Sequence, residues 1–221
     1  VYTTGRFNGT ADFDPGPGTE NLNSIGYADA FIQKLDSSGN LLWVISLESE
    51  DHTICYSITT DATGNVYCVG SFNDTVDFDF SAGVFNLASD WNDHSDIFIL
   101  KLDPNGNFIW AKSMGGKYND VGFSITTDAT GNLYCTGFFR DTADFDPGPD
   151  TFNLISVSPL SHSNIYVQKL DSNGNFIWAK SMGLGWGTSI TTDTNGNVYT
   201  AGNFFQDTAD FDPGPDTFNL I

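Results

Sequence analysis

Basic residues are scarce in this chain. Only 8 Lys and Arg stand against 28 Asp and Glu in 221 residues, which gives a formal net charge of −20 at pH 7. Because nucleic acids and anionic membrane surfaces both attract basic segments, we expect neither of them as a partner. Metal cations, or solubility in a salty medium, are better interpretations of the charge.

Long apolar runs and a cysteine framework are also missing. No stretch approaches the roughly 18 apolar residues of a spanning helix, so we expect no membrane insertion. Cys68 and Cys135 occupy places where other repeats carry Thr3 and Thr200, so we interpret both as packing residues rather than disulfide partners. Cys55 has no such counterpart, and three Cys leave at least one free thiol. The start on Val and the missing signal peptide suggest a mature or trimmed piece of a longer protein.

Repetition is what the chain has in abundance. One acidic phrase, Thr-Ala-Asp-Phe-Asp-Pro-Gly-Pro, is found at Thr10–Pro17, Thr142–Pro149 and Thr208–Pro215, with a diverged copy at Thr75–Ala82. The copies recur every 65 to 67 residues. This period exceeds the ~40–45 residues of a WD40 blade, so the phrase is interpreted as an insertion in a repeated supersecondary unit.

Each repeat contains four runs rich in β-branched and aromatic residues, and no helical period appears. In the third repeat the runs are Ser124–Asp128, Leu133–Phe139, Ile165–Leu170 and Phe176–Met182. The turn Asp-x-x-Gly-Asn joins the first run to the second and the third to the fourth, and it occurs six times. Gly supplies the positive φ of a tight hairpin, and Asp bonds to the backbone ahead of it. The repeat is therefore predicted to be a meander, with these turns at one edge and the acidic insertion at the other.

A four-stranded sheet with two partly apolar faces needs neighbours, and radial repetition supplies them. We predict an all-β fold, a β-propeller-type array of four-stranded antiparallel blades with about three and a quarter blades in this chain. The single array 1–221 divides into a partial blade 1–47, blades 57–114 and 124–182, and a partial blade 189–221. Residues 198–221 repeat residues 1–24 in phase, so we expect no ring closed within the chain. The chain would then be part of a larger propeller, or its copies would associate head to tail or edge to edge.

The runs Asp171–Trp178, Ser189–Asp193 and Gly196–Tyr199 resemble the bacterial β-propeller repeat family (SBBP repeats). The resemblance extends over essentially the whole chain and implies a secreted or cell-surface bacterial protein, often multidomain. It implies a non-enzymatic structural or adhesive role, in a surface fibre or a larger propeller. The alternatives are a carbohydrate- or ligand-binding propeller module and a quinoprotein-like propeller enzyme fragment. Exposed aromatics on one face would favour the former, and a funnel of non-repeated polar residues the latter.

The acidic phrase is the candidate metal site. In an extended Asp-Phe-Asp the two carboxylates share one face while Phe points to the other, toward the core. Ca²⁺ takes about 6–8 oxygen ligands, and paired carboxylates favour it. The candidate Ca²⁺ ligands are Asp12, Asp14, Asp144, Asp146, Asp150, Asp210, Asp212 and Asp216. The alternative is a turn in which these Asp side chains cap backbone amides without a cation. No other cofactor and no catalytic residue is predicted.

Three further sets of residues recur. Trp43, Trp110 and Trp178 follow the turn glycines, and we interpret them as packing between blades. His52, His94 and His162 have no neighbouring His or Cys in the sequence, which makes a metal site there a poor interpretation. Thr75, Thr142 and Thr208 follow Asp in a pattern that resembles glycosylated threonines of some secreted bacterial proteins; the alternative is that Thr simply favours strands.

Overall fold

The computed structural model describes residues 1–90, 94–156, 162–205, 209–212, 214 and 218–220. Every regular element within these ranges is a β-strand, and all strand pairs of the sheets are antiparallel. The predicted all-β, propeller-type array is therefore confirmed. No helix in this part of the chain is long and apolar enough to cross a membrane.

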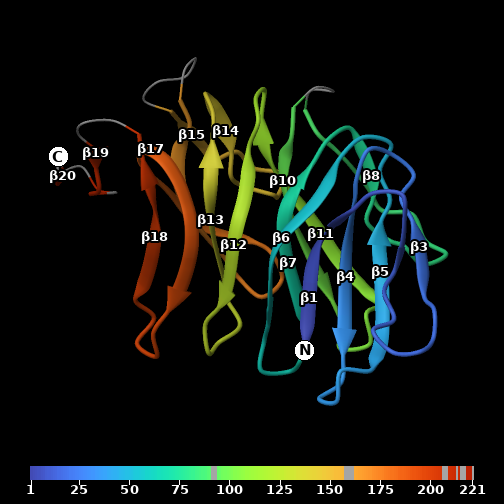
Figure 1. The fold of residues 1–221 in the computed structure, drawn as a ribbon. Helices are drawn as coiled ribbons and strands as arrows, with labels where there is room; N and C mark the ends of the chain where they lie inside the picture. Colours follow the sequence, from blue (N-terminus) through green and yellow to red (C-terminus); the bar gives the residue numbers. More distant parts are fainter. Residues whose placement is uncertain (91–93, 157–161, 206–208, 213, 215–217, 221) are drawn as a thin grey trace.

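The first two blades follow the predicted meander. In the first, the strands lie in the order β1 (Tyr2–Phe7), β4 (Asp29–Leu35) and β5 (Leu41–Leu47). The second contains, from its inner to its outer strand, β6 (Thr53–Thr60), β7 (Val66–Phe72), β10 (Asp96–Leu102) and β11 (Phe108–Gly116). Its sheet continues from β11 into the short strands β14 (Thr142–Asp144) and β15 (Asn153–Ile155), because Gly115 and Gly116 pair with Asp144 and Ala143. The sheets stand side by side in chain order, with the first blade at the right of Figure 1.

The third blade and the strands that follow it form one continuous sheet. Its order is β12 (Val121–Thr127), β13 (Leu133–Phe139), β16 (Asn164–Leu170), β17 (Phe176–Thr192) and β18 (Val198–Phe204). The sequence predicted two strands separated by a Gly-rich link, but β17 runs through that link. Leu184 pairs with Asn164 of β16 and Gly185 pairs with Phe204 of β18, so strand pairing continues across it.

The Asp-x-x-Gly-Asn turns form as predicted, at the lower edge of the blades in Figure 1. At the turn into β7, Asp61 Oδ1 accepts hydrogen bonds from the amides of Thr63 and Asn65 at 2.9 and 3.0 Å. Its Oδ2 accepts bonds from Asn65 Nδ2 and the Tyr67 hydroxyl at 2.8 and 3.0 Å. Gly64 has a φ of 85°, the left-handed conformation that the turn requires.

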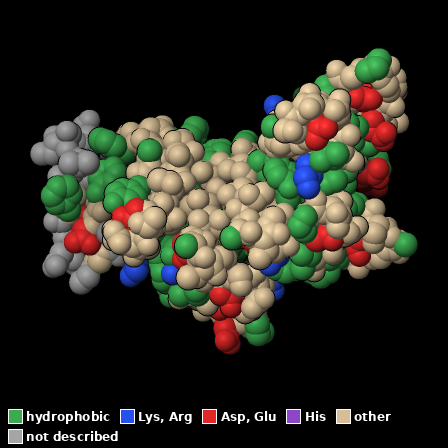
Figure 2. Space-filling model, turned by 90° about the horizontal axis from the view of Figure 1, so that it is seen from below, with side chains coloured by type: hydrophobic (Ala, Val, Ile, Leu, Met, Phe, Trp, Pro, Cys, Tyr) green, Lys and Arg blue, Asp and Glu red, His purple; other side chains and the backbone are tan. Residues whose placement is uncertain are grey.

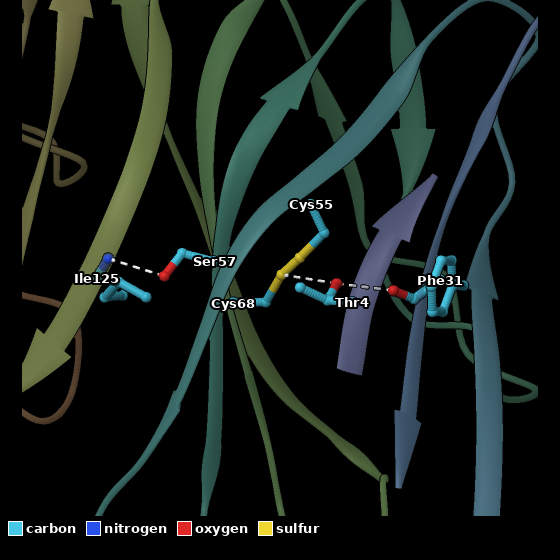
Figure 3. Close-up of a disulfide and its surroundings, with 6 residues drawn as sticks. All are labelled: Thr4, Phe31, Cys55, Ser57, Cys68 and Ile125. Atoms are coloured by element: carbon cyan, nitrogen blue, oxygen red, sulfur yellow. Dashed lines mark hydrogen bonds between the residues drawn. A yellow bond between two sulfur atoms is a disulfide. The ribbon is translucent and has the colours of Figure 1, made fainter. Parts of the chain in front are cut away.

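The inner strands are linked across blades by the hydroxyl groups of the repeated Ser-Ile-Thr-Thr run. The amide of Ile125 in β12 donates to Ser57 Oγ in β6 at 3.3 Å (Figure 3), and Ile190 donates likewise to Ser124 at 3.2 Å. Thr127 Oγ1 donates back to the carbonyl of Thr60 at 3.2 Å. Through these hydroxyl groups the second blade hydrogen-bonds to the third, and the third to the strand that follows it.

The apolar core lies between successive blades. Between the first two blades it is formed mainly by Ala30, Ile32, Leu47, Val66, Phe72, Phe78, Phe98, Leu100 and Leu102. Between the second and third blades it is formed mainly by Tyr67, Val69, Ile97, Ile99, Ile125, Leu133, Phe139, Phe145, Tyr166 and Leu170. Each blade thus buries its faces against its neighbours, which is the physical reason for the repeat.

The interpretation of Cys68 as a packing residue rather than a disulfide partner is wrong. Cys55 and Cys68 form a disulfide between β6 and β7, with a Cα–Cα distance of 6.4 Å (Figure 3). The pairing of these strands shifts register between Cys55 and Ser57, so that Cys55 pairs with Gly70 and lies on the same face of the sheet as Cys68, two residues along β7. Gly122 stands at the corresponding position of the third blade, so Cys135 has no such partner and remains a free, buried thiol.

Candidate functional site

Each acidic phrase belongs to a short hairpin rather than a loop. The hairpin of the third blade pairs β14 (Thr142–Asp144) with β15 (Asn153–Ile155). The equivalent pairs are β2 (Thr10–Asp12) with β3 (Asn21–Asn23), β8 (Thr75–Asp77) with β9 (Asn86–Ala88), and β19 (Ala209–Asp210) with β20 (Asn219–Leu220). Sequence reasoning missed the returning strand, although an Asn-Leu pair follows every acidic phrase.

The carboxylates of the phrase hold the hairpin turn. In the third blade, Asp144 Oδ1 accepts bonds from the amides of Asp146 and Phe152 at 3.0 and 2.8 Å, and Asp146 Oδ1 accepts one from Gly148 at 2.8 Å. The other three copies contain the same bonds. Backbone hydrogen bonds from Glu20 and Asp14 lower the pKa of Asp12. The turn chemistry is therefore present in every copy, and it occupies only the Oδ1 oxygens.

The phenylalanine between the two carboxylates packs the hairpin against the strands of its own blade. Phe145 is fully buried, with ring-centroid distances of 5.5 Å to Phe139 and 4.8 Å to Tyr166. The first and second blades repeat this trio as Phe7, Phe13 and Phe31, and as Phe72, Phe78 and Phe98. Phe points inward and the carboxylates outward, as the alternation predicted. Strands β8, β14 and β15 lie at the upper edge in Figure 1, opposite the Asp-x-x-Gly-Asn turns.

Two grooves open between the outer strand of one blade and the hairpin of the next. The groove between β5 and the β8 hairpin has a volume of about 410 Å³ and includes Glu48, Asp77 and Asp79. The groove between β11 and the β14 hairpin has a volume of about 170 Å³, and its acidic residues are Asp90, Asp96, Asp144 and Asp146. Figure 2 shows the opposite edge of the molecule, where Asp and Glu side chains form separate small groups among polar and backbone atoms.

The predicted metal ligands are distributed among the separate hairpins. Asp12 and Asp150 are exposed, Asp216 lies outside the described residues, and the rest are half-buried: Asp14, Asp144, Asp146, Asp210 and Asp212. Within the described ranges, no three His, Cys, Asp or Glu side chains gather as a group that could hold a metal ion. The pairs at Asp12/Asp14, Asp144/Asp146 and Asp210/Asp212 stay separate, and Ca²⁺ binding by them stays a prediction.

Two buried carboxylates beside the second groove were not predicted. Asp96 is 4% exposed and Asp120 is fully buried. Asp96 Oδ2 accepts a bond from the amide of Asp90 at 3.0 Å, and Asp120 Oδ1 accepts one from the amide of Arg140 at 2.9 Å. The other oxygen of each, Asp96 Oδ1 and Asp120 Oδ2, is buried and forms no hydrogen bond of good geometry. The backbone amide of Gly116 is near both carboxylates and lowers their pKa values, but it does not offset their burial. Burial raises the pKa of Asp96 to about 7, and burial together with the charge of Asp96 raises the pKa of Asp120 well above its usual value.

A break in the repeat was the signal that could have revealed this pair. Asp120 stands where the neighbouring repeats have Thr53 and Gly185. Asp96 is the first residue of β10, as Asp29 is of β4. Because the residue type recurs at this position, the sequence indicates a structural role for Asp96. The two oxygens of Asp29 are both used, by the amides of Ser49 and Ile25 at 3.1 and 3.0 Å.

The histidines lie apart from one another. The ring of His52 is 4.6 Å from that of Tyr27, His94 Nδ1 lies 3.3 Å from Asn119 Oδ1, and His162 is exposed. Thr75 and Thr142 are exposed at the first positions of β8 and β14, and Thr208 lies outside the described residues. The arrangement leaves both threonines accessible to modification.

A row of aromatic rings crosses the inner strands. Ring centroids are 5.1 Å apart for Tyr56 and Phe123, 6.2 Å for Phe123 and Trp186, and 5.1 Å for Trp186 and Phe205. Phe138 stacks on Trp186 at 5.6 Å with an interplanar angle of 28°. Tyr56, Trp186 and Phe205 are about two-fifths exposed, at 42%, 39% and 42%. Sequence reasoning did not foresee this row, because its members come from different strands.

Comparison with known proteins agrees with the architecture. Residues 184–203 match the family model described as a beta-propeller repeat (SBBP), which confirms the predicted resemblance to SBBP repeats for this segment. The chain is also similar to an uncharacterized WD repeat-containing protein of Acanthamoeba polyphaga mimivirus, with 28% identity over 112 residues. That alignment covers 49% of this chain and 8% of the relative, so the chain spans a small part of that protein's length.

Proposed function

We propose that this β-propeller repeat protein is a structural or adhesive scaffold of a bacterial surface or secreted assembly, without catalytic activity of its own. The observation that carries the proposal is that the repeated residues form contacts between units. Ser57 and Ser124 accept bonds from the next blade, and Thr127 donates to the preceding one. An array built in this way can be extended by adding units, as a scaffold requires.

An extracellular location is supported by two features. Disulfides such as Cys55–Cys68 persist in oxidising compartments and are rare in the cytosol of mesophiles. The net charge of −20 favours solubility outside the cell and disfavours nucleic-acid partners. Secretion and surface exposure are therefore part of the proposal.

The proposed partner is a further propeller unit, either from the remainder of a larger propeller or from a second copy of the chain. Strand β18 pairs with β17 on one side, and six of its seven residues are exposed. Its exposed side chains include Tyr199 at 55% and Phe204 at 38%. An exposed strand edge of this kind is a template for pairing with another strand.

Light scattering coupled to size exclusion, over a concentration series, tests the scaffold proposal on the chain of 24.0 kDa. We expect species larger than the monomer, seen as extended particles by negative-stain microscopy. Ala201→Lys in β18 should dissociate them, because a lysine on an edge strand opposes pairing. Ile109→Lys, at an exposed site on β11, is the matched control and should not. A monodisperse monomer at every concentration, with no binding to cell envelopes, would contradict the proposal.

The aromatic row favours a second candidate, a carbohydrate-binding module. Exposed aromatic faces such as that of Trp186 offer stacking surfaces for apolar sugar faces. Titration with a panel of soluble bacterial polysaccharides, followed by tryptophan fluorescence, tests it. Trp186→Ala should abolish a fluorescence-detected interaction that Tyr199→Ala, away from the row, retains. No response to any polysaccharide of the panel would argue against this candidate.

A further inference from the structure

We propose that Asp96 and Asp120 together bind a hard divalent cation, Ca²⁺ or Mg²⁺, beside the groove between the second and third blades, which Asp96 lines. This site differs from the Asp-Phe-Asp turns, because its two primary ligands come from the start of β10 and from the residue before β12. It goes beyond the scaffold function, which does not require it.

The two unpartnered oxygens face a common point. A β-carbon added at Gly115 would lie 2.3 Å from Asp96 Oδ1 and 3.1 Å from Asp120 Oδ2. Gly115 has no such atom, so the carboxylates converge on the space beside its backbone. That point is a covalent bond length from the Gly115 Cα, so a cation would lie farther from Gly115, between the two carboxylates, with oxygen ligands at about 2.3–2.6 Å for Ca²⁺ or about 2.0–2.1 Å for Mg²⁺.

Nothing else in the described structure neutralises the pair. Neither carboxylate forms an ion pair within the described residues. Arg140, whose backbone amide bonds Asp120 Oδ1, does not use its guanidinium for this purpose, and its Nε has no hydrogen-bond partner. Two buried carboxylates cannot both ionise without a counter-charge, and a bound cation supplies that charge.

The groove supplies the rest of a coordination shell. Asp90, Asp144 and Asp146 line it around Asp96 and Gly115, and its volume of about 170 Å³ has room for several waters. Mg²⁺ commonly keeps several waters and binds through one or two carboxylates, and Ca²⁺ accepts water in a flexible shell. Two carboxylates and bound water therefore suffice, although no three acidic side chains meet at one point.

The neighbouring groove is a natural control. Between the first and second blades, Glu48 replaces Gly115 and Thr53 replaces Asp120, while the hairpin carboxylates Asp77 and Asp79 are kept. That groove has the acidic hairpin without the buried pair. A cation effect that depends on the pair can therefore be separated from one that depends on the Asp-Phe-Asp turns.

The test is thermal melting and isothermal titration calorimetry of the full chain after EDTA treatment, with CaCl2 and MgCl2 in separate arms. We expect one strong site per chain and a rise in Tm in at least one arm, because a ligand of the folded state stabilises it. Asp120→Asn should lose this rise and weaken binding at least about tenfold.

Asp96→Asn should behave in the same way, and circular dichroism would show that both variants are folded. Asp79→Asn, in the control groove, should keep the full cation response. The proposal fails if neither cation raises the Tm of the wild type, or if both Asp96→Asn and Asp120→Asn keep the rise. Loss of the rise in Asp79→Asn would assign it to the hairpin turns and would also overturn the proposal.

Discussion

The indole of Trp43, in β5 of the first blade, lies against Gly106 in a turn of the second blade. A β-carbon at Gly106 would be 3.1 Å from Trp43 Cδ2. Trp110 and Gly174 repeat this relationship between the second and third blades, also at 3.1 Å. The interpretation of Trp43 and Trp110 as packing between blades is therefore confirmed, and the turn glycine has a second role beyond its positive φ.

The two roles of the turn glycine can be separated by mutation. Gly39 and Gly106 have nearly equal φ values, 85° and 87°, but Gly39 has nothing within 4 Å of its added β-carbon. Gly39→Ala should cost about 1–2 kcal/mol for the left-handed conformation alone. Gly106→Ala should cost a further ~1–3 kcal/mol for crowding of Trp43. Urea denaturation of both variants measures the difference, and equal losses would show that Trp43 does not constrain the turn.

Features of the fold that depend on residues close together in the sequence could be predicted, and features that depend on distant strands could not. The turns at Gly39 and Gly106 are local, because Asp, Gly and Asn within five residues determine them. Phe145 was correctly assigned to the core because alternation in a strand is local too. The register shift beside Cys55 and the continuous pairing through Gly185 depend on neighbouring strands, so the sequence pattern did not predict them.

The same distinction applies to the candidate site, where one set of acidic residues could be predicted from the sequence and the other could not. Asp144 and Asp146 could be found because their phrase recurs. The buried pair of Asp96 and Asp120 could not, since it exists only where the start of β10 meets the start of the next blade. Its members are 24 positions apart in the sequence and belong to different repeats. A search for polar residues that break the repeat would have found Asp120 but not its partner.

The three cysteines should differ in reactivity. Burial raises the pKa of the Cys135 thiol to about 12, so almost no thiolate forms at neutral pH. We expect Ellman's reagent to detect no thiol in the native protein, one after denaturation, and three after reduction and denaturation. A native thiol signal would show that Cys135 is accessible or that the disulfide is absent.

Loss of the disulfide should destabilise the β6–β7 hairpin. The bridge spans a sequence separation of 13 residues, and closing a loop of this size contributes about 3 kcal/mol in the chain-entropy treatment. Cys68→Ser should therefore lower the free energy of unfolding by up to about that amount. Cys135→Ser, which breaks no bridge, is the control for replacing a buried sulfur in the third blade. Chemical denaturation without reductant compares them, and equal losses would contradict a stabilising bridge.

The hydroxyl bonds between inner strands should contribute measurably to cohesion between blades. Ser124 Oγ accepts the amide of Ile190 at 3.2 Å, and its removal leaves that amide without this partner. Ser124→Ala should cost about 1 kcal/mol. Ser38→Ala, in an exposed turn, should cost less than half as much. Hydrogen exchange at Ile190 gives a local measurement, and unchanged protection there in Ser124→Ala would refute the role of this bond.

Stability should fall in acid because of the turn aspartates. Partial burial raises the pKa of Asp61, but hydrogen bonds from Thr63, Asn65 and Tyr67 outweigh it and lower the pKa to about 2; Asp128 is shifted to the same value. A folded-state pKa below the usual 3.8 means that this stabilisation is complete above about pH 4 and is lost as the pH falls through about 2. After allowance for solvent screening, we expect each carboxylate to contribute about 1 kcal/mol.

The double variant Asp61→Asn/Asp128→Asn tests this expectation in urea denaturation from pH 7 to pH 2. It should be about 2 kcal/mol less stable than the wild type at pH 7, and the two should converge as the pH approaches 2. Convergence follows because the wild-type carboxylates become protonated there, whereas the amides of the variant do not titrate. Asp150→Asn, at an exposed position, is the control and should follow the wild type throughout. A difference between double variant and wild type that stays constant across the pH range would show that Asp61 and Asp128 stabilise the turns by shape rather than by charge.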